Sequence, residues 1–191
     1  KHLTKIINFS EKDGEVIVEP GVIQDDLNNF LKPYNLKFAP DTSTSNRAMV
    51  GGMIGNNSCG AYSVFYGTTR EHVKSVEVVL SDGSLVEFKE LNELELDKKL
   101  SLKTLEGDIY RFIINLLNKN KQQILDAFPD ESLIRRNTGY ALDELIRKYL
   151  LDYSKGKKFS LVPLICRSEG TLGVIVSAVL NLGNLPKHKG L

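Results

Sequence analysis

Glycines, small hydroxyl residues and side-chain amides crowd into residues 41–60, a stretch with few charges. Its glycines have no Cβ, so the backbone there can adopt positive φ and lie against a flat or charged ligand. The hydroxyls and amides of residues 42–46 and 56–58 can form hydrogen bonds with ring edges and phosphate oxygens. Consecutive amide N–H groups in a glycine turn can also form a concave anion site. The stretch predicts a nucleotide-like ligand held largely by backbone.

A structural explanation of the same glycines is open at this point. A glycine cluster can mark a tight turn or a close helix packing, and the number of glycines does not separate these from a ligand site. A nucleotide-triphosphate loop would have a lysine followed by Ser or Thr directly after a spaced pair of glycines, and the stretch has no such pair of residues. It also lacks a clean Gly-x-Gly-x-x-Gly dinucleotide fingerprint.

Short strands and one helix are predicted around this stretch. The predicted strands are residues 5–9, 15–18, 73–80, 85–88, 161–165 and 174–180. Asp13-Gly14 and residues 81–84 supply the turns of two hairpins. Residues 23–31 have helical apolar spacing, which Pro33 is expected to stop. Pro163 assigns its strand to an edge or a bulge, because proline cannot donate to a sheet.

Residues from about 90 to 153 change character and become charged and helical. Their apolar residues fall on faces with helical spacing, which predicts a helical excursion inserted between strands. Within it, residues 135–140 form a compact polar cluster that begins with two arginines. Adjacent arginines can bind a carboxylate or phosphate, but a helix-end role explains them equally well.

The composition is that of an ordinary globular protein. The 191 residues are 41% hydrophobic and 26% charged, with a formal net charge of +1, which gives no support for nucleic-acid binding. Cys59 and Cys166 form no CxxC pair, so no metal site is predicted and a reducing, cytoplasmic compartment fits best, with peripheral membrane association as an alternative. No apolar run approaches the roughly 20 residues that span a bilayer.

An ordered set of motifs makes the assignment specific. The motifs are Val18–Val22, Ala39–Asp41, Val50–Gly60, Tyr66–Gly67, Val76–Gly83 and Ser168–Ile175. In this order and spacing they resemble the FAD-binding domain of the vanillyl-alcohol oxidase type, and within it the D-lactate, glycolate and D-2-hydroxyglutarate dehydrogenase branch. Residues 136–143 also resemble a segment of that branch.

The resemblance implies an α+β fold, with a mixed or antiparallel sheet flanked by helices, as in the second subdomain of such a module. It also implies FAD as cofactor. The implied FAD-binding residues are Pro40, Asp41, Thr42, Ser43, Gly51, Gly52, Gly55, Asn56, Asn57, Ser58, Cys59, Gly60, Tyr66, Gly67, Glu169, Gly170, Leu172, Gly173 and Val174. For Glu169, capping of nearby backbone N–H groups is an equal alternative. Arg136 and Tyr140 are the implied substrate contacts.

Two parts of the resembled family have no counterpart in this sequence. One is a glycine-rich phosphate loop upstream of the first strand, and the other is a C-terminal cap domain that supplies catalytic histidines. His2, His72 and His188 do not match those histidines, so the catalytic residues are unknown. We expect residues 1–191 to be a partial FAD-binding domain that is inactive alone and binds FAD weakly or not at all.

The expected function follows from the same resemblance. It is the FAD-binding portion of a dehydrogenase that oxidises a small, D-configured 2-hydroxy acid. Its electron acceptor would be other than nicotinamide, with an iron–sulfur domain or a quinone as candidates. The alternatives are a sugar-nucleotide reductase or an aldonolactone oxidase of the same fold, and a scaffold module that has lost the flavin.

Overall fold

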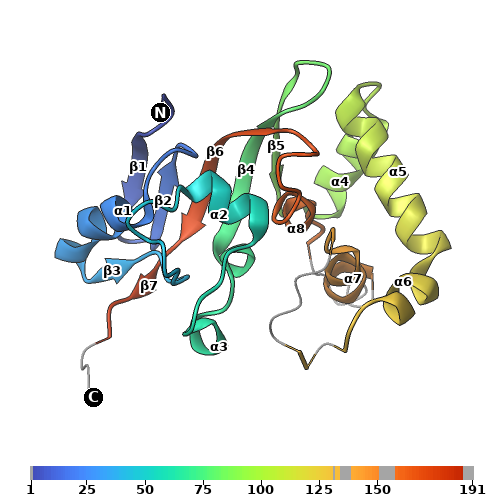
Figure 1. Ribbon diagram of the computed structural model, residues 1–191. Helices are drawn as coiled ribbons and strands as arrows, with labels where there is room; N and C mark the ends of the chain where they lie inside the picture. The colour runs from blue at the N-terminus through green and yellow to red at the C-terminus, as the bar shows by residue number, and fades with distance from the viewer. Residues whose placement is uncertain (1, 131, 134–138, 151–157, 187–191) are drawn as a thin grey trace.

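An antiparallel sheet forms the centre of the protein (Figure 1). The computed structural model describes residues 2–130, 132–133, 139–150 and 158–186. In spatial order, the strands of the sheet are β1 (Ile6–Ser10), β2 (Glu15–Val18), β6 (Val174–Asn181), β4 (Val73–Val79) and β5 (Leu85–Lys89). Every neighbouring pair is antiparallel, so the predicted α+β class is confirmed and its sheet is of the antiparallel kind.

Two local hairpins and one long-range strand build this sheet. Gly14 (φ 64°) closes the β1–β2 hairpin and Gly83 (φ 83°) closes the β4–β5 hairpin, because both turns need a left-handed residue. Strand β6 then inserts between them, with Ala178 opposite both Val18 and Val76. The last strand of the chain therefore joins the two hairpins into one sheet.

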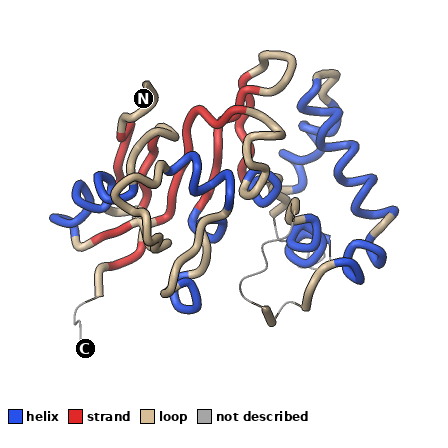
Figure 2. Tube along the Cα trace, viewed as in Figure 1, coloured by secondary structure: helices blue, strands red, loops and turns tan. Residues whose placement is uncertain are grey.

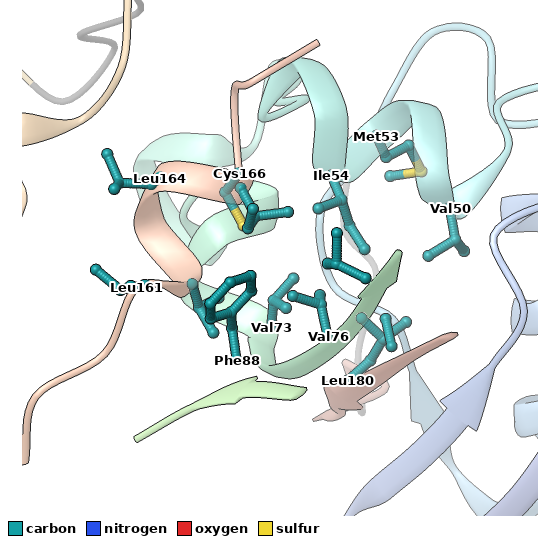
Figure 3. Close-up of a cluster of buried hydrophobic side chains, with 14 of the residues drawn as sticks. Val50, Met53, Ile54, Val73, Val76, Phe88, Leu161, Leu164, Cys166 and Leu180 are labelled. Carbon is teal, nitrogen blue, oxygen red and sulfur yellow. The ribbon is translucent and has the colours of Figure 1, made fainter. Parts of the chain in front are cut away.

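The main core lies between the sheet and the helices on one of its faces. These helices are α1 (Gln24–Leu31), α2 (Val50–Asn56) and α8 (Val162–Ile165). Figure 3 shows Val50 and Ile54 of α2 and Cys166 at the end of α8 directed towards the side chains of the strands. All three are fully buried. Burying each large apolar side chain contributes about 1.5–3 kcal/mol, which fixes both helices on the sheet.

A helical layer lies beyond β5 (Figures 1 and 2). It consists of α4 (Glu93–Ser101), α5 (Leu105–Lys119), α6 (Lys121–Ala127), α7 (Leu142–Leu145) and a π-helical turn, Ile146–Leu150. Asn92 and Glu95 form a capping box at the start of α4. Tyr110 of α5 is fully buried between Phe88 and Phe159, at ring distances of 6.1 and 6.2 Å, and thereby anchors α5 to the sheet.

Short elements complete the described chain. They are a 3-10 turn at Lys32–Tyr34, β3 (Leu36–Lys37), α3 (Ser63–Tyr66), a second 3-10 turn at Thr69–His72 and β7 (Gly183–Asn184). Strand β7 pairs with β3, which brings the end of the described chain back beside α1. Among the described residues, no helix combines the length and hydrophobicity needed to cross a membrane.

One of two local predictions that involve proline was wrong. Residues 161–165 are not a strand, because Val162–Ile165 forms α8 with Pro163 in its first turn. Proline is well tolerated there, since an N–H in the first turn needs no helical partner. The prediction for the other proline is confirmed, because α1 ends at Leu31, two residues before Pro33. Pro33 lies in a separate 3-10 turn, Lys32–Tyr34, and Asn35 (φ 56°) ends that turn.

Candidate cofactor site

The first glycine-rich segment is mainly a helix. Gly51, Gly52 and Gly55 lie in α2, and neither they nor Gly60 has positive φ. The predicted conformational reason for these four glycines was therefore wrong. At Gly51 the alternative of close packing holds, because an added Cβ would lie 2.5 Å from Pro20 Cβ and 3.1 Å from the Pro20 carbonyl oxygen. At Gly60 an added Cβ would lie 2.5 Å from Asp41 Oδ2.

The second glycine-rich segment, residues 167–173, is a turn with unusual backbone angles. Arg167 has φ 93° and Glu169 has φ 52°, and Gly170 follows with φ 77°. For residues that carry a Cβ this region costs roughly 1–2 kcal/mol each. Such strain persists only where the surrounding structure holds the backbone in place.

Backbone hydrogen bonds join this turn to α2. The Arg167 N–H donates to the Ile54 carbonyl at 3.0 Å, and the Glu169 N–H donates to the Gly55 carbonyl at 2.9 Å. The last carbonyls of a helix lack a helical partner, so the turn supplies a donor to the Gly55 carbonyl and a second donor to the Ile54 carbonyl, which also accepts from the Asn57 N–H. Two glycine-rich segments far apart in the sequence thus become one continuous surface.

An open groove of about 500 Å³ runs along this joint surface. Six predicted cofactor residues line it: Gly51, Gly52, Gly55, Gly170, Gly173 and Val174. A Cβ added to Gly52 or Gly170 would meet no atom within 4 Å, so these two glycines leave space that a side chain would fill. Exposed apolar side chains border the space, with Met49 48% and Val174 65% exposed.

Sequence reasoning missed part of the groove. His2, Leu3, Pro20, Gly21, Met49 and Ile175 also line it. The signal for two of them was available in the Val18–Val22 motif, where Pro20-Gly21 follows a strand. Gly21 is required by close packing, because an added Cβ would lie 2.5 Å from the Leu3 carbonyl oxygen, and its N–H donates to that oxygen at 2.7 Å.

The predicted residues 40–43 form a loop that a buried side chain of α1 holds in place. The side chain of Gln24, 2% exposed, donates from Nε2 to the Pro40 carbonyl and accepts from Thr42 Oγ1 at 2.8 Å. The Asp41 carboxylate accepts from the Tyr62 N–H at 3.2 and 3.3 Å, which fixes the chain that leaves Gly60. Ser43 is exposed.

The predicted residues 56–58 mainly support the backbone. Asn57 is fully buried and ends α2 with φ 52°. Its Oδ1 accepts from the Arg70 N–H at 2.8 Å, and its Nδ2 has no acceptor among the described residues. The Ser58 carbonyl accepts from both N–H and Oγ1 of Thr69, at 3.0 and 2.8 Å, while Ser58 Oγ donates to Asn56 Oδ1.

Tyr66 and Gly67 lie further along the chain, at the end of α3. The Nζ of Lys37 lies 3.6 Å from the centre of the Tyr66 ring, a cation–π contact. The Tyr66 carbonyl is 2.6 Å from His72 Nε2, so the histidine has a structural partner, and Gly67 turns the chain with φ 78°. The residues of the 40–43, 56–60 and 66–67 segments do not line the groove, and their cofactor contacts stay predictions.

The remaining predicted residues lie elsewhere. Leu172 borders a separate apolar groove together with Phe112 and Leu164. The Tyr140 hydroxyl is 2.8 Å from Thr171 Oγ1, against the second glycine turn. Arg136 lies outside the described residues. The backbone of Glu169 binds Gly55, and its carboxylate makes none of the capping hydrogen bonds found among the described residues.

Two titratable groups beside the second glycine-rich segment have shifted pKa values. Burial raises the pKa of the Cys166 thiol to about 12, so this cysteine is inert. Burial also lowers the pKa of the Arg167 guanidinium, and the charge of Glu169 opposes that shift. Among the described residues, no three His, Cys, Asp or Glu side chains gather closely enough to hold a metal ion. The arrangement can therefore bind a flat group through backbone and apolar contacts.

Comparison with known sequences assigns the first part of the chain to a family. Residues 1–89 match the FAD binding domain family. These residues belong to that family. The family implies FAD in the full protein, and the groove fits a flat ring system because Gly52 and Gly170 leave its wall free of side chains.

Relatives of this FAD-binding domain agree with the predicted branch. D-2-hydroxyglutarate dehydrogenase of Escherichia coli is 38% identical over 192 residues, which is all of this chain and 18% of that protein. Glycolate oxidase subunit GlcD of Bacillus subtilis is 35% identical over 86 residues, or 45% of this chain and 18% of that protein. The matched regions thus span about a fifth of the length of these relatives. The predicted family resemblance is confirmed.

Solved structures support the fold. A structure of alkyldihydroxyacetonephosphate synthase matches 97% of this chain and 22% of its own length, with a TM-score of 0.55 and 16% identity. At that identity the likeness concerns the fold alone.

Proposed function

We propose that residues 1–191 form part of the FAD site of a flavin-dependent dehydrogenase, with α4–α7 as a helical excursion from the FAD-binding domain. The observation that carries the proposal is the groove in which α2 and the turn at residues 167–173 meet. Gly52 and Gly170 leave space for a ring in the wall of this groove, and the apolar side chains at its borders suit an aromatic face.

Each segment has a proposed role in holding the cofactor. Gly52 and Gly170 provide backbone contact with the flat face, and Val174 provides an apolar edge. The loops at residues 40–43 and 56–60 supply hydroxyl, amide and backbone groups for the polar parts of the cofactor. These residues would hold FAD, which would supply the hydride-accepting group, while the protein would position the ring and exclude competing reactions.

We further propose a small 2-hydroxy acid of the D-2-hydroxyglutarate, D-lactate or glycolate kind as substrate. Support comes from relatives whose names carry these substrates, among them the D-2-hydroxyglutarate dehydrogenases of Escherichia coli and Pantoea ananatis, 38% and 34% identical. The proposed acceptor is other than nicotinamide, with an iron–sulfur domain or a quinone as candidates. The catalytic acid and base are proposed to lie outside this chain.

The test is FAD binding by the full-length protein and by residues 1–191, followed by visible absorption and flavin fluorescence. Gly52→Leu should fill the groove and weaken FAD binding at least tenfold, while the helix tolerates leucine. Gly183→Ala is the matched control, because its added Cβ would make an ordinary 3.5 Å contact with Ala39, in β7 and away from the groove.

The outcomes separate the alternatives. A flavin spectrum in the full-length protein, weakened by Gly52→Leu and unchanged by Gly183→Ala, supports the site. Absence of flavin even with excess FAD would refute it and favour a scaffold module. Turnover of D-2-hydroxyglutarate, D-lactate or glycolate with an artificial electron acceptor supports the substrate class, whereas turnover of a sugar nucleotide or an aldonolactone alone would refute it.

A further inference from the structure

One hydrogen bond connects the helical layer to the second glycine turn. Tyr140, just before α7, places its hydroxyl 2.8 Å from Thr171 Oγ1. Thr171 Oγ1 in turn donates to the Ser168 carbonyl at 2.5 Å, and the Thr171 N–H donates to the same carbonyl at 2.9 Å. Thr171 therefore closes the turn, and Tyr140 holds Thr171 from the outside.

The turn needs such support because its backbone is strained. Arg167 and Glu169 both hold positive φ, and two inter-segment hydrogen bonds to α2 fix only the first half of the turn. The second half carries Gly170 and Gly173, which line the groove. Between them lies Thr171, so the Tyr140 contact acts on the half of the turn that α2 does not hold.

A second chain of contacts runs from α7 to the first glycine segment. Glu144 of α7 pairs with the Arg70 guanidinium at 3.4 Å, and both side chains are largely buried, at 12% and 9% exposed. The Arg70 N–H donates to Asn57 Oδ1, and Asn57 ends α2. The segment from Tyr140 to Glu144 thus contacts the residues that support both walls of the groove.

We propose that Tyr140 is a positioning residue for the groove: through Thr171 it holds the turn at the spacing from α2 that a flat cofactor requires. The proposal rests on the proposed function and assigns Tyr140 a different role from the predicted substrate contact. Without its hydroxyl, the second half of the turn becomes less ordered in the FAD-free protein. Cofactor binding must then order the turn, and this entropic cost lowers the affinity for FAD.

The experiment compares Tyr140→Phe, Thr171→Val and the double variant in the full-length protein. Tyr140→Phe should weaken FAD binding about three- to tenfold, the effect of one neutral hydrogen bond. The double variant should bind no more weakly than Thr171→Val, because both single changes remove the same contact. Tyr34→Phe is the control, since Tyr34 is 40% exposed against 41% for Tyr140 and its hydroxyl has no hydrogen bond among the described residues.

Hydrogen exchange of the FAD-free protein gives a readout that does not depend on the cofactor. The amides of residues 169–173 should exchange faster in Tyr140→Phe than in the wild type, and Tyr34→Phe should leave them unchanged. Unaltered exchange together with unaltered FAD affinity would overturn the proposal. A raised KM for the hydroxy acid at saturating FAD, with unchanged FAD affinity, would assign Tyr140 to the substrate instead. If the wild type binds no FAD, the proposed function fails while exchange still tests the Tyr140 contact.

Discussion

The two walls of the groove use glycine for different physical reasons. In α2 the glycines have ordinary helical backbone angles, and their use is the space that a missing side chain leaves. In the turn at residues 167–173, Gly170 has φ 77°, a backbone angle that glycine adopts without cost. The comparison teaches that a glycine cluster in a sequence does not by itself reveal whether space or conformation is needed.

Even neighbouring glycines of one helix differ. Both line the groove, but a Cβ added at Gly51 would meet Pro20, whereas a Cβ added at Gly52 would meet no atom within 4 Å. Each glycine lowers helix stability by up to about 1 kcal/mol relative to alanine, but only at Gly51 does close packing require the missing side chain. A position that gives up stability without gaining packing is a candidate for ligand contact, which is the role proposed for Gly52.

The largest expected effect is at the turn. Gly173→Ala would place a Cβ against Val78 Cγ1 and 2.9 Å from the Val79 carbonyl oxygen, in the β4 strand that the turn must reach. Overpacking against backbone should lower the free energy of unfolding by about 3 kcal/mol and weaken FAD binding. Denaturant unfolding measures the first effect. An unchanged unfolding midpoint would show that the contact at Gly173 is not required.

The next comparison is between two glycines of α2, whose replacement by alanine should change the free energy of unfolding in opposite directions. Gly51→Ala should destabilise the protein by about 1–3 kcal/mol, because its Cβ meets Pro20. Gly52→Ala should raise stability by about 0.5–1 kcal/mol through helix propensity, yet weaken FAD binding. Thermal unfolding without FAD and an FAD titration test both variants. If Gly52→Ala binds FAD as well as the wild type, Gly52 does not contact the cofactor.

A smaller effect is expected where the turn carries a non-glycine residue at positive φ. Glu169→Gly should raise the free energy of unfolding by about 0.5–1 kcal/mol, since relief of the left-handed strain at φ 52° exceeds the entropy lost by glycine. Glu169→Gln, which keeps the Cβ, is the control and should leave stability nearly unchanged. A loss of stability in Glu169→Gly would mean that its carboxylate supports the turn.

The two cysteines extend the comparison to reactivity. Cys59, in the first segment, is half-buried, whereas Cys166, beside the turn, is fully buried with a pKa of about 12. An alkylating reagent should modify Cys59 in the folded protein and Cys166 only after unfolding, as mass spectrometry can measure. The unfolded thiol ionises near pH 9, so the stability from keeping Cys166 protonated is present below pH 9 and is lost as the pH rises towards 12. Equal modification of both thiols would contradict the burial of Cys166.

Much of the fold was predictable because its signals are local. The β-branched runs at β4 and β6, the turn residues Asp13-Gly14 and the spacing of apolar residues in α1 all depend on neighbours in sequence. The prediction failed at α8, where a four-residue apolar run fits a strand or a buried helix equally well. It also failed for φ at Gly51 and Gly52, since a helix needs no positive φ from the glycines it contains.

The candidate site divides in the same way. The motif order was sufficient to predict the FAD-binding family and named six residues that line the groove. It did not predict Met49 as a border of the groove or the hydrogen bond between Tyr140 and Thr171, and the predicted substrate contact of Tyr140 stays a prediction. Those contacts join residues that are distant in sequence, and no local pattern encodes them.

By itself, then, the sequence determined the kinds of element, the two glycine-rich segments and the cofactor class that their order implies. Only the tertiary structure decided which glycines share a surface. The physical reason is the insertion of β6 between β2 and β4, with Val174 opposite Val79 and Ala178 opposite Val18. That register brings the turn before β6 to the end of the sheet where Pro20 follows β2. Helix α2 begins beside Pro20 and ends beside the turn, and the groove forms there.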